Sequence, residues 1–357
     1  DPAEVRPGDP AEEPKPTRLT RNPGSDTSPV WHPDGTLLAH ETTTRPEIVD
    51  YAQTHLAVIP AGGGDARVLT DDLDRNTRAP RFSPDGTELF FLLEDHGEVQ
   101  LARMPVAGGE VTRVLTGPRV VKKAEVGPGG TVVTLISEPQ RPGDLFASGP
   151  EDLGVGDLRP LTRVNEKLLS GITLAEVDKV GFRSSDGTPL EAFLYKPPGF
   201  EPGRRYPTIL WPHGGPQAQH DHAFSFRGQL FAANGYLVVM PNPRGSTGYG
   251  LDFTMAIWAD WGNKDTTDIL AAVDHAIELG HADPHRLGVG GWSYGGILTN
   301  YVITQTDRFK GAISGASEVL YIANYGHDHY QRQWEAELGL PWEGDNRDNW
   351  ERISPFN

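Results

Sequence analysis

A repeat in the amino-terminal half of the chain constrains the fold more than any other feature of the sequence. The dipeptide Leu-Thr recurs there at intervals of about 46 to 50 residues. The four copies begin at Leu19, Leu69, Leu115 and Leu161. A fixed period of this length indicates a supersecondary unit that is stacked several times, because one unit cannot bury its own apolar face.

Each interval contains the same succession of turn and strand signals. A Pro-Asp-Gly turn, replaced by Pro-Gly-Gly in the third copy, precedes an apolar run, and a second run ends in a glycine-rich hairpin. The turns occupy residues 31–35, 82–86 and 126–130. Four short strands per period are typical of a β-propeller blade, so we expect a partial β-propeller of about three blades, fewer than the roughly four to eight of a closed one. An irregular β-sandwich is the alternative.

Composition and pattern divide the chain into three parts. Residues 1–18 carry five prolines and five acidic residues with almost no apolar side chain, which predicts a flexible lead-in. Residues 19–165 hold the repeats. From residue 166 to 357, short apolar runs such as 236–240 alternate with a helical pattern over 264–279. This alternation predicts an α/β fold with a doubly wound sheet.

The composition excludes several classes of protein. A formal net charge of −17 leaves no overall attraction for nucleic acid or an anionic membrane, so neither is an expected partner. The longest apolar runs have the length of a strand, far below the roughly 20 residues of a membrane-spanning helix. The absence of cysteine excludes disulfides and a cysteine nucleophile. No signal peptide can be read, and we expect a cytoplasmic protein by default, which leaves open a signal peptide that was removed.

The strongest motif for chemistry lies in residues 286–296, RLGVGGWSYGG. A strand-like run leads there into G-x-S-x-G, with Ser293 between Gly291 and Gly295, and a helix-like run follows. A nucleophilic serine on a tight strand-to-helix turn needs glycines two residues away, because larger side chains would clash. We therefore predict that Ser293 is a nucleophile.

A second glycine motif follows an earlier predicted strand. The sequence WPHGGP places Gly214 and Gly215 where the backbone can approach a bound carbonyl oxygen. Acyl transfer needs two amide donors at the developing oxyanion, and we assign them to the N–H of Tyr294 and to the loop of His213, Gly214 and Gly215. We expect a structural role for His213 rather than that of a general base.

Other polar motifs give weaker signals. The loop NPRGSTGYG at residues 242–250 lacks the lysine of a P-loop and the dinucleotide-binding pattern, and we expect it to pack beside the active site. Two His-Asp-His triplets, at residues 220–222 and 327–329, are interpreted as solvated surface histidines. We expect no metal and no cofactor.

The partners of the serine are harder to find. In an α/β-hydrolase the order is serine, then a carboxylate, then histidine, each of the last two on a loop after a further strand. The candidates after Ser293 lie instead in polar helix and loop sequence, and we do not expect any of them to be a triad member. These candidates are His327, Asp328, His329 and Asp345.

Five segments together resemble the prolyl oligopeptidase family of serine peptidases, and more narrowly its acylaminoacyl peptidase and dipeptidyl peptidase branch. They read HGGP at 213–216, NPRGSTGYG at 242–250, WADWGNKD at 258–265, DPHRLGVGGWSYGG at 283–296 and TDRFKGAISGAS at 306–317. The resemblance implies an α/β-hydrolase covered by a propeller, usually of seven blades, that admits short peptides. It also implies that the sequence is an internal fragment whose triad carboxylate and histidine lie beyond residue 357, and that the fragment alone is inactive.

The expected function is a serine-type peptidase that hydrolyses short peptides through an acyl-enzyme. A carboxylesterase of the same fold is one alternative, and a propeller-based binding module with a relic hydrolase is another. Exopeptidase or oligopeptidase action, the residue preference at the cut and the oligomeric state stay open.

Overall fold

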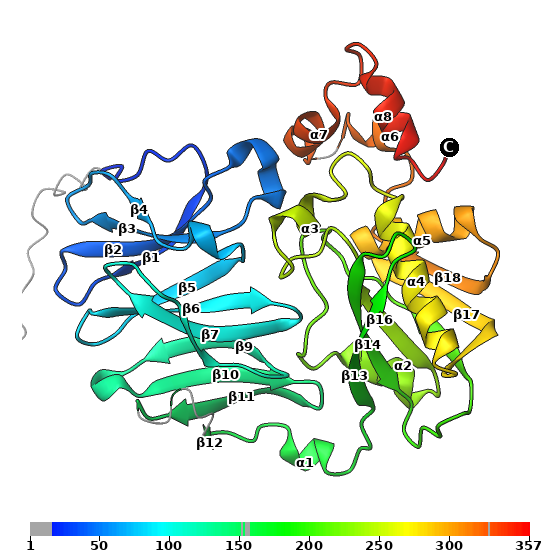
Figure 1. Ribbon diagram of the computed structural model, residues 1–357, viewed down its shortest axis with the longest axis horizontal. Helices are drawn as coiled ribbons and strands as arrows, with labels where there is room; N and C mark the ends of the chain where they lie inside the picture. Colours follow the sequence, from blue (N-terminus) through cyan, green and yellow to red (C-terminus); the bar gives the residue numbers. More distant parts are fainter. Residues whose placement is uncertain (1–15, 151–152, 154–157, 328) are drawn as a thin grey trace, which may run out of the picture.

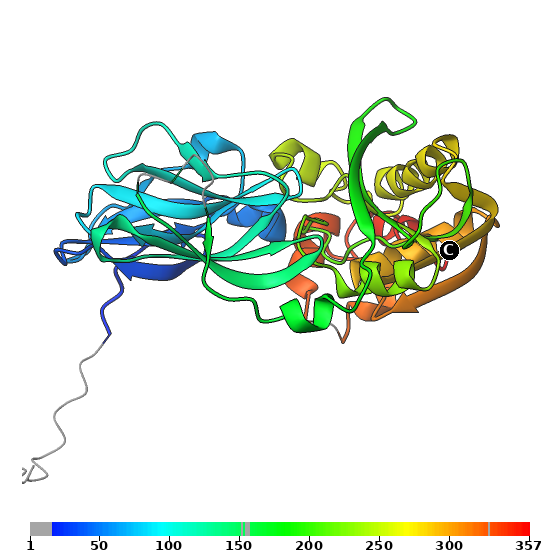
Figure 2. The ribbon, with the colours of Figure 1, turned by 90° about the horizontal axis from the view of Figure 1, so that it is seen from below.

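The computed structural model describes residues 16–150, 153, 158–327 and 329–357. Most of the predicted lead-in, residues 1–15, therefore lies outside the described residues, as does Asp328. Figures 1 and 2 show antiparallel sheets at one side of the molecule and a mixed α/β sheet at the other. No helix within the described ranges has the length and apolar character needed to cross a membrane.

The amino-terminal part consists of three units, each with four antiparallel strands. The first unit contains β1 (Asp26–Trp31), β2 (Leu37–Thr42), β3 (His55–Pro60) and β4 (Arg67–Val68). The second contains β5 (Thr77–Phe82), β6 (Glu88–Asp95), β7 (Glu98–Pro105) and β8 (Thr112–Leu115). The third contains β9 (Val120–Val126), β10 (Val132–Glu138), β11 (Arg141–Ser148) and β12 (Arg159–Pro160). The expected partial propeller of about three blades is confirmed.

Turn chemistry explains why each repeat forms a hairpin. In the second unit the carboxylate of Asp85 accepts hydrogen bonds from Ser83 Oγ at 2.6 Å and from the amide of Thr87 at 3.0 Å. Gly86 follows with a φ of 72°, a conformation that costs glycine little. His32 of the first unit lies against this turn, with Nε2 3.0 Å from the Gly86 carbonyl oxygen. The same residues therefore make the turn and join neighbouring units.

A six-stranded sheet forms the carboxyl-terminal part, in the order β13-β14-β16-β15-β17-β18. Its strands are β13 (Glu176–Arg183), β14 (Pro189–Lys196), β15 (Tyr206–Leu210), β16 (Leu237–Asn242), β17 (Ala282–Trp292) and β18 (Phe309–Gly315). The first two strands are antiparallel, and β16, β15, β17 and β18 run parallel to one another.

Helices cover both faces of this sheet, as expected for a doubly wound fold. Leu237 and Val239 of β16 pack in a core with α4 (Lys264–Glu278) and α5 (Tyr294–Gln305), whereas Val238 and Met240 pack in another core with α2 (Phe226–Ala233). Because alternate side chains of a strand point to opposite faces, burial on both sides explains the continuous apolar run at 237–240. The predicted α/β-hydrolase sheet is confirmed.

Several short helices complete the described chain. They are η1 (Pro46–Tyr51), η2 (Asp71–Leu73), η3 (Pro128–Gly130), α1 (Glu166–Leu169), α3 (Leu251–Met255), α6 (Tyr321–Asn324), α7 (Gln331–Leu338) and α8 (Asn346–Arg352). The part of the chain that is described contains no strand after β18, which is an edge strand. Its Ile313 is 64% exposed beside a groove of about 520 Å³.

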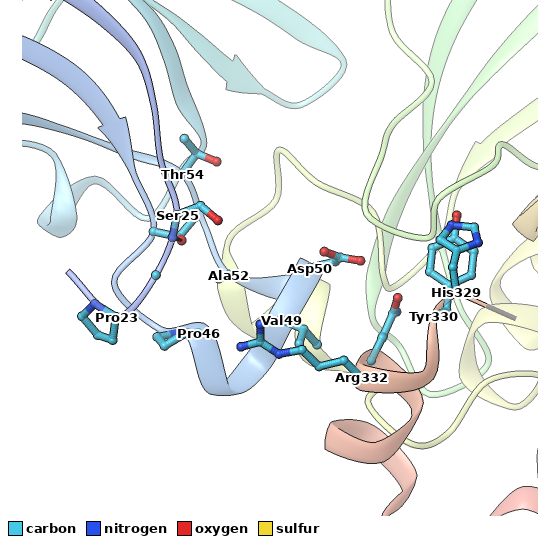
Figure 3. Close-up of a pocket in the computed structure, with 13 residues that line it drawn as sticks. Pro23, Ser25, Pro46, Val49, Asp50, Ala52, Thr54, His329, Tyr330 and Arg332 are labelled. Atoms are coloured by element: carbon cyan, nitrogen blue, oxygen red, sulfur yellow. Dashed lines mark hydrogen bonds between the residues drawn. The ribbon is translucent and has the colours of Figure 1, made fainter. Parts of the chain in front are cut away.

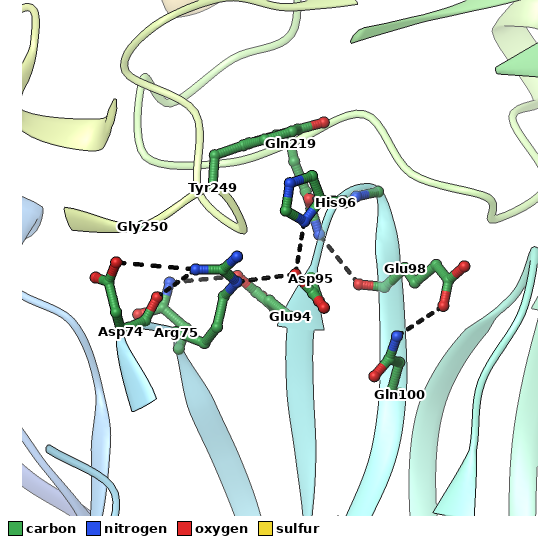
Figure 4. Close-up of polar contacts among 12 residues, drawn as sticks. Asp74, Arg75, Glu94, Asp95, His96, Glu98, Gln100, Gln219, Tyr249 and Gly250 are labelled. Carbon is green, nitrogen blue, oxygen red and sulfur yellow. Dashed lines mark hydrogen bonds and ion pairs between the residues drawn. The ribbon is translucent and has the colours of Figure 1, made fainter. Parts of the chain in front are cut away.

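The tip of the β6–β7 hairpin docks the second propeller unit onto the hydrolase part (Figure 4). The amide of His96 donates to the carbonyl of Gly248 at 3.1 Å, and the amide of Gly97 donates to Gln219 Oε1 at 2.9 Å. A Cβ atom at Gly97 would lie 2.7 Å from the Phe193 ring, so only glycine fits this contact. The ring of His96 is held by Asp95, with Nδ1 and Oδ1 2.7 Å apart.

Candidate active site

Ser293 lies on the turn between β17 and α5 with a φ of 58° and a ψ of −127°. A serine rarely adopts such a backbone, and strain of this kind collects at functional sites. The turn is held on both sides, because the Ser293 amide donates to the carbonyl of Gly315 at 2.9 Å and its carbonyl accepts from the Ile297 amide at 3.0 Å. This is the geometry of a nucleophile elbow.

Close backbone approach explains the glycines around Ser293. A Cβ atom at Gly291 would lie 2.2 Å from the carbonyl carbon of Gly295, and one at Gly295 would lie 2.4 Å from the carbonyl oxygen of Pro212. No side chain fits at such distances. The glycines in the motif therefore allow the turn to pack against the WPHGGP loop.

The WPHGGP loop lies directly beside the serine. A Cβ atom at Gly214 would lie 3.4 Å from Ser293 Cβ and 4.0 Å from Ser293 Oγ. Within the described residues, no hydrogen-bond acceptor takes the amide of Gly214 or Gly215. Tyr294 is the first residue of α5, where the amide has no partner inside the helix. Amides without an acceptor among the described residues thus occur in the two backbone segments next to the serine, and an oxyanion hole needs donors of this kind.

A cavity of about 530 Å³ opens in front of Ser293. Both parts of the chain line it: Gly215 and Trp292, the last residue of β17, come from the hydrolase part, and Asp50 comes from η1 of the first propeller unit. The other lining residues are Gln217, Trp261, Tyr294, Ile297, Ala316, Glu318, Tyr330, Gln333 and Trp334. The site therefore lies where a propeller segment meets the hydrolase part.

A neighbouring cavity of about 550 Å³ shares Asp50, Tyr330 and Gln333 with the cavity of Ser293. Figure 3 shows Asp50 on η1 at one side of it and Tyr330, just before α7, at the other. The carboxylate of Asp50 has no ion pair among the described residues. Val49, which precedes it, has a φ of 41°, an unusual backbone for a β-branched residue.

His213 is a buried neutral residue. Its Nε2 is hydrogen-bonded to Ser246 Oγ at 2.9 Å, and its Nδ1 to the carbonyl oxygen of Gly214 at 2.7 Å. Burial lowers the pKa of His213 to about 4. These contacts support a structural role, in which His213 fixes the Gly214 loop against the 242–250 loop.

The interpretation of the first His-Asp-His triplet as surface residues is wrong. His222 is buried, and its amide donates to the carbonyl of Gly97 at the interface between the two parts. His220 Nε2 is hydrogen-bonded to the carbonyl oxygen of Trp211 at 2.9 Å, and burial lowers the pKa of His220 to about 3. Docking of the propeller covers these histidines, which local sequence could not predict.

No group of residues able to hold a metal ion occurs in the described part of the chain. In the second triplet, His327 is exposed and Asp328 lies outside the described residues. None of the described triad candidates, His327, His329 and Asp345, lines the cavity of Ser293. Among the residues that the structure describes, no hydrogen bond joins Ser293 Oγ to a base.

The sequence did not reveal one buried carboxylate next to the site. Asp265 of α4 accepts a hydrogen bond from the hydroxyl of Tyr294, and also from the amides of Gly262 at 3.1 Å and Thr266 at 2.8 Å. Burial raises the pKa of Asp265 to about 6. The motif WADWGNKD contained this residue, but no spacing rule connects it with Tyr294.

Residues 222–357 match the model of the prolyl oligopeptidase family. The uncharacterized peptidase YuxL of Bacillus subtilis is 36% identical over 211 residues, which cover 57% of this chain and 31% of the relative. Dipeptidyl-peptidase 5 of Porphyromonas gingivalis is 27% identical over 329 residues, which cover 90% of this chain and 47% of the relative.

A structure of the Pyrococcus horikoshii acylaminoacyl peptidase is similar, with a TM-score of 0.78 and 26% identity. The match covers 90% of this chain and 50% of that chain. This chain thus spans about half the length of the solved structure and about a third to a half of the two curated relatives.

Proposed function

We propose that this chain, whose carboxyl-terminal part belongs to the prolyl oligopeptidase family in the dipeptidyl peptidase and acylaminoacyl peptidase branch, carries the nucleophile of a serine peptidase. Its substrates are short peptides. The observation that carries the proposal is the strained backbone of Ser293 beside the unpartnered amides of the Gly214 loop. Residues 19–165 form the partial propeller and residues 166–357 the hydrolase part.

The reaction follows from this geometry. Ser293 Oγ bonds to the scissile carbonyl carbon and loses its proton to a base, while the carbonyl oxygen becomes an oxyanion held by the amides of Tyr294 and Gly214 or Gly215. The carbon–nitrogen bond then breaks, and the amine leaves with the proton. Water attacks the acyl-enzyme, releases the acid and returns the proton to Ser293.

The base comes from residues outside this sequence. Ser293 Oγ has no histidine partner among the described residues, and the exposed apolar edge at β18 leaves room for a further strand. The two curated relatives are about twice as long as this chain and have room for such a segment. The chain by itself is therefore inactive or nearly so, because an unassisted serine hydroxyl is a weak nucleophile.

The size of the cavity and the origin of its walls support short peptides as substrates. The cavity of about 530 Å³ accommodates a few peptide residues. Residues of η1 and of the segment before α7 line both this cavity and the neighbouring one, and so restrict the access of a long chain to Ser293. The names of the two characterised relatives, dipeptidyl-peptidase and acylaminoacyl peptidase, indicate removal of short units from one end. Two acidic residues, Asp50 and Glu318, line this cavity, and their charge favours a substrate with a free amino terminus.

The test uses the full-length protein and its Ser293→Ala variant. We expect the parent to release dipeptides from peptidyl anilides and to be labelled at Ser293 by a fluorophosphonate, and we expect the variant to lose both properties. Acyl esters are assayed in parallel, and a strong preference for them would favour the carboxylesterase. Activity that persists in Ser293→Ala would exclude this serine as the nucleophile.

A further inference from the structure

One segment of the first propeller unit penetrates the core of the hydrolase part. This segment is η1, between β2 and β3, which lies beside α3 and α7 (Figure 1). Tyr51, its last residue, is 1% exposed and belongs to the same apolar core as α4 and α5. Its ring packs edge-on against Trp258, with centroids 5.2 Å apart.

The hydroxyl of Tyr51 is fixed by hydrogen bonds on two sides. It accepts from Trp261 Nε1 at 2.8 Å and donates to Glu337 Oε1 of α7 at 2.9 Å. The same oxygen of Glu337 accepts from the amide of Ala259 at 2.9 Å. The hydroxyl therefore connects the propeller with α7 and with the loop before α4.

Trp261 extends this connection to the nucleophile turn. Its ring packs edge-on against Tyr294 with centroids 5.0 Å apart, and both residues line the cavity of Ser293. The loop that carries Trp261 also donates to Asp265 through the amide of Gly262, and Asp265 holds the hydroxyl of Tyr294. Tyr294 is thus held by the ring of Trp261 and by Asp265.

We propose that Tyr51 is a positioning residue of the peptidase site: its hydroxyl fixes Trp261, and Trp261 fixes Tyr294 and the direction of the Tyr294 amide. The inference rests on the proposed function, in which that amide binds the oxyanion. A small misplacement of such a donor is costly, because the donor is useful only when it is aligned in advance with the developing charge. The propeller then completes the site in addition to covering it.

A purely structural role for Tyr51 would have different consequences. If the hydrogen bonds only stabilised the fold, their loss would lower the melting temperature and leave kcat unchanged for the folded protein. Loss of positioning lowers kcat with little change in KM, because the oxyanion forms only after the substrate has bound. Kinetics on folded variants therefore separate the two roles.

The experiment compares Tyr51→Phe with Tyr325→Phe in the full-length protein. Tyr325 donates to Glu335, also on α7, at 2.5 Å, so the control removes a hydrogen bond between the same residue types, an exposed one that lies outside the cavity. We expect Tyr51→Phe to lower kcat by about tenfold with KM changed by less than about twofold, and Tyr325→Phe to match the parent. An unchanged kcat in Tyr51→Phe overturns the inference.

Two variants of Glu337, the acceptor of the Tyr51 hydroxyl, test the same connection. They keep the inference testable if Tyr51→Phe does not fold. Glu337→Gln keeps an acceptor for Tyr51 and for the Ala259 amide, whereas Glu337→Ala removes it. We expect kcat of Glu337→Ala to be about tenfold lower than that of the parent, and kcat of Glu337→Gln to lie within about twofold of the parent. Equal kcat in both variants overturns the inference. Failure of the proposed function is distinguishable, since Ser293→Ala then stays active.

Discussion

The hydroxyl of Tyr294, the residue after Ser293, donates a hydrogen bond to the carboxylate of Asp265 on α4. Both side chains are buried, so this contact joins the start of α5 to the start of α4 without access to water. The side chain of Tyr294, whose amide we propose as a donor to the oxyanion, is thereby held by a second helix. Burial disfavours the charged form of the carboxylate and so shifts its pKa, and this shift can be measured as a dependence of stability on pH.

The first prediction concerns Asp265 and pH. Its pKa is raised from 3.8 to about 6 by burial, so the folded protein binds more protons than the unfolded chain between these values. The free energy of unfolding should therefore fall as the pH rises from about 4 to about 6, by about 3 kcal/mol from this group.

Urea denaturation of this chain at several pH values, compared with Asp265→Asn, measures that contribution. The variant should lack this part of the pH dependence, and the difference between the two proteins removes the contribution of other groups. Identical pH profiles would show that Asp265 titrates normally in the folded protein.

The second prediction concerns the strain at Ser293. A φ of 58° is unfavourable for serine, because its Cβ atom crowds the backbone, whereas glycine adopts it without this strain. Ser293→Gly should raise the free energy of unfolding by about 1 kcal/mol, whereas Ser293→Ala should leave it nearly unchanged, since alanine keeps the Cβ atom. Chemical denaturation of the parent and the two variants measures these free energies of unfolding. If Ser293→Gly is less stable than Ser293→Ala, the turn is not strained.

The third prediction concerns the packing of the elbow glycines. Gly295→Ala places a Cβ atom 2.4 Å from the Pro212 carbonyl oxygen and should destabilise the fold by about 3 kcal/mol. Gly311→Ala on β18 is the control, because no atom lies within 4 Å of its Cβ position. Thermal denaturation should show a clear loss for the first variant and a change within about 0.5 kcal/mol for the second.

The fourth prediction concerns Asp50 in the full-length protein. Its carboxylate lines the cavity of Ser293 without an ion pair among the described residues, so an ammonium group of the substrate is a suitable partner. Asp50→Asn should raise KM about tenfold for peptides with a free amino terminus. Amino-terminally acetylated peptides should show no such change, and an equal effect on both kinds of peptide would exclude recognition of the amino group.

Much of the fold could be predicted because its signals are local. The turn at Asp85 and Gly86 is made by hydrogen bonds within a few residues, so each repeat specifies its own hairpin. The elbow around Ser293 is likewise encoded by glycines two residues away, and the structure shows why they are needed. Short apolar runs such as 236–240, alternating with a helical pattern, predict the doubly wound sheet, and the structure shows that β16 is buried on both faces.

Tertiary structure decided which distant residues meet, and with them the environment of the site. Asp265 and Tyr294 are 29 residues apart, and Tyr51 and Glu337 are 286 apart, so no periodicity connects either pair. The sequence predicts surface positions for the histidines at 220 and 222, and this is wrong because the hairpin at Gly97, from a distant part of the chain, docks beside them. The sequence by itself determined the repeats, the sheet and the tight turn at Ser293, since these depend on neighbouring residues. Burial and pKa depend on what packs against a group from elsewhere in the chain, and only the folded molecule sets them.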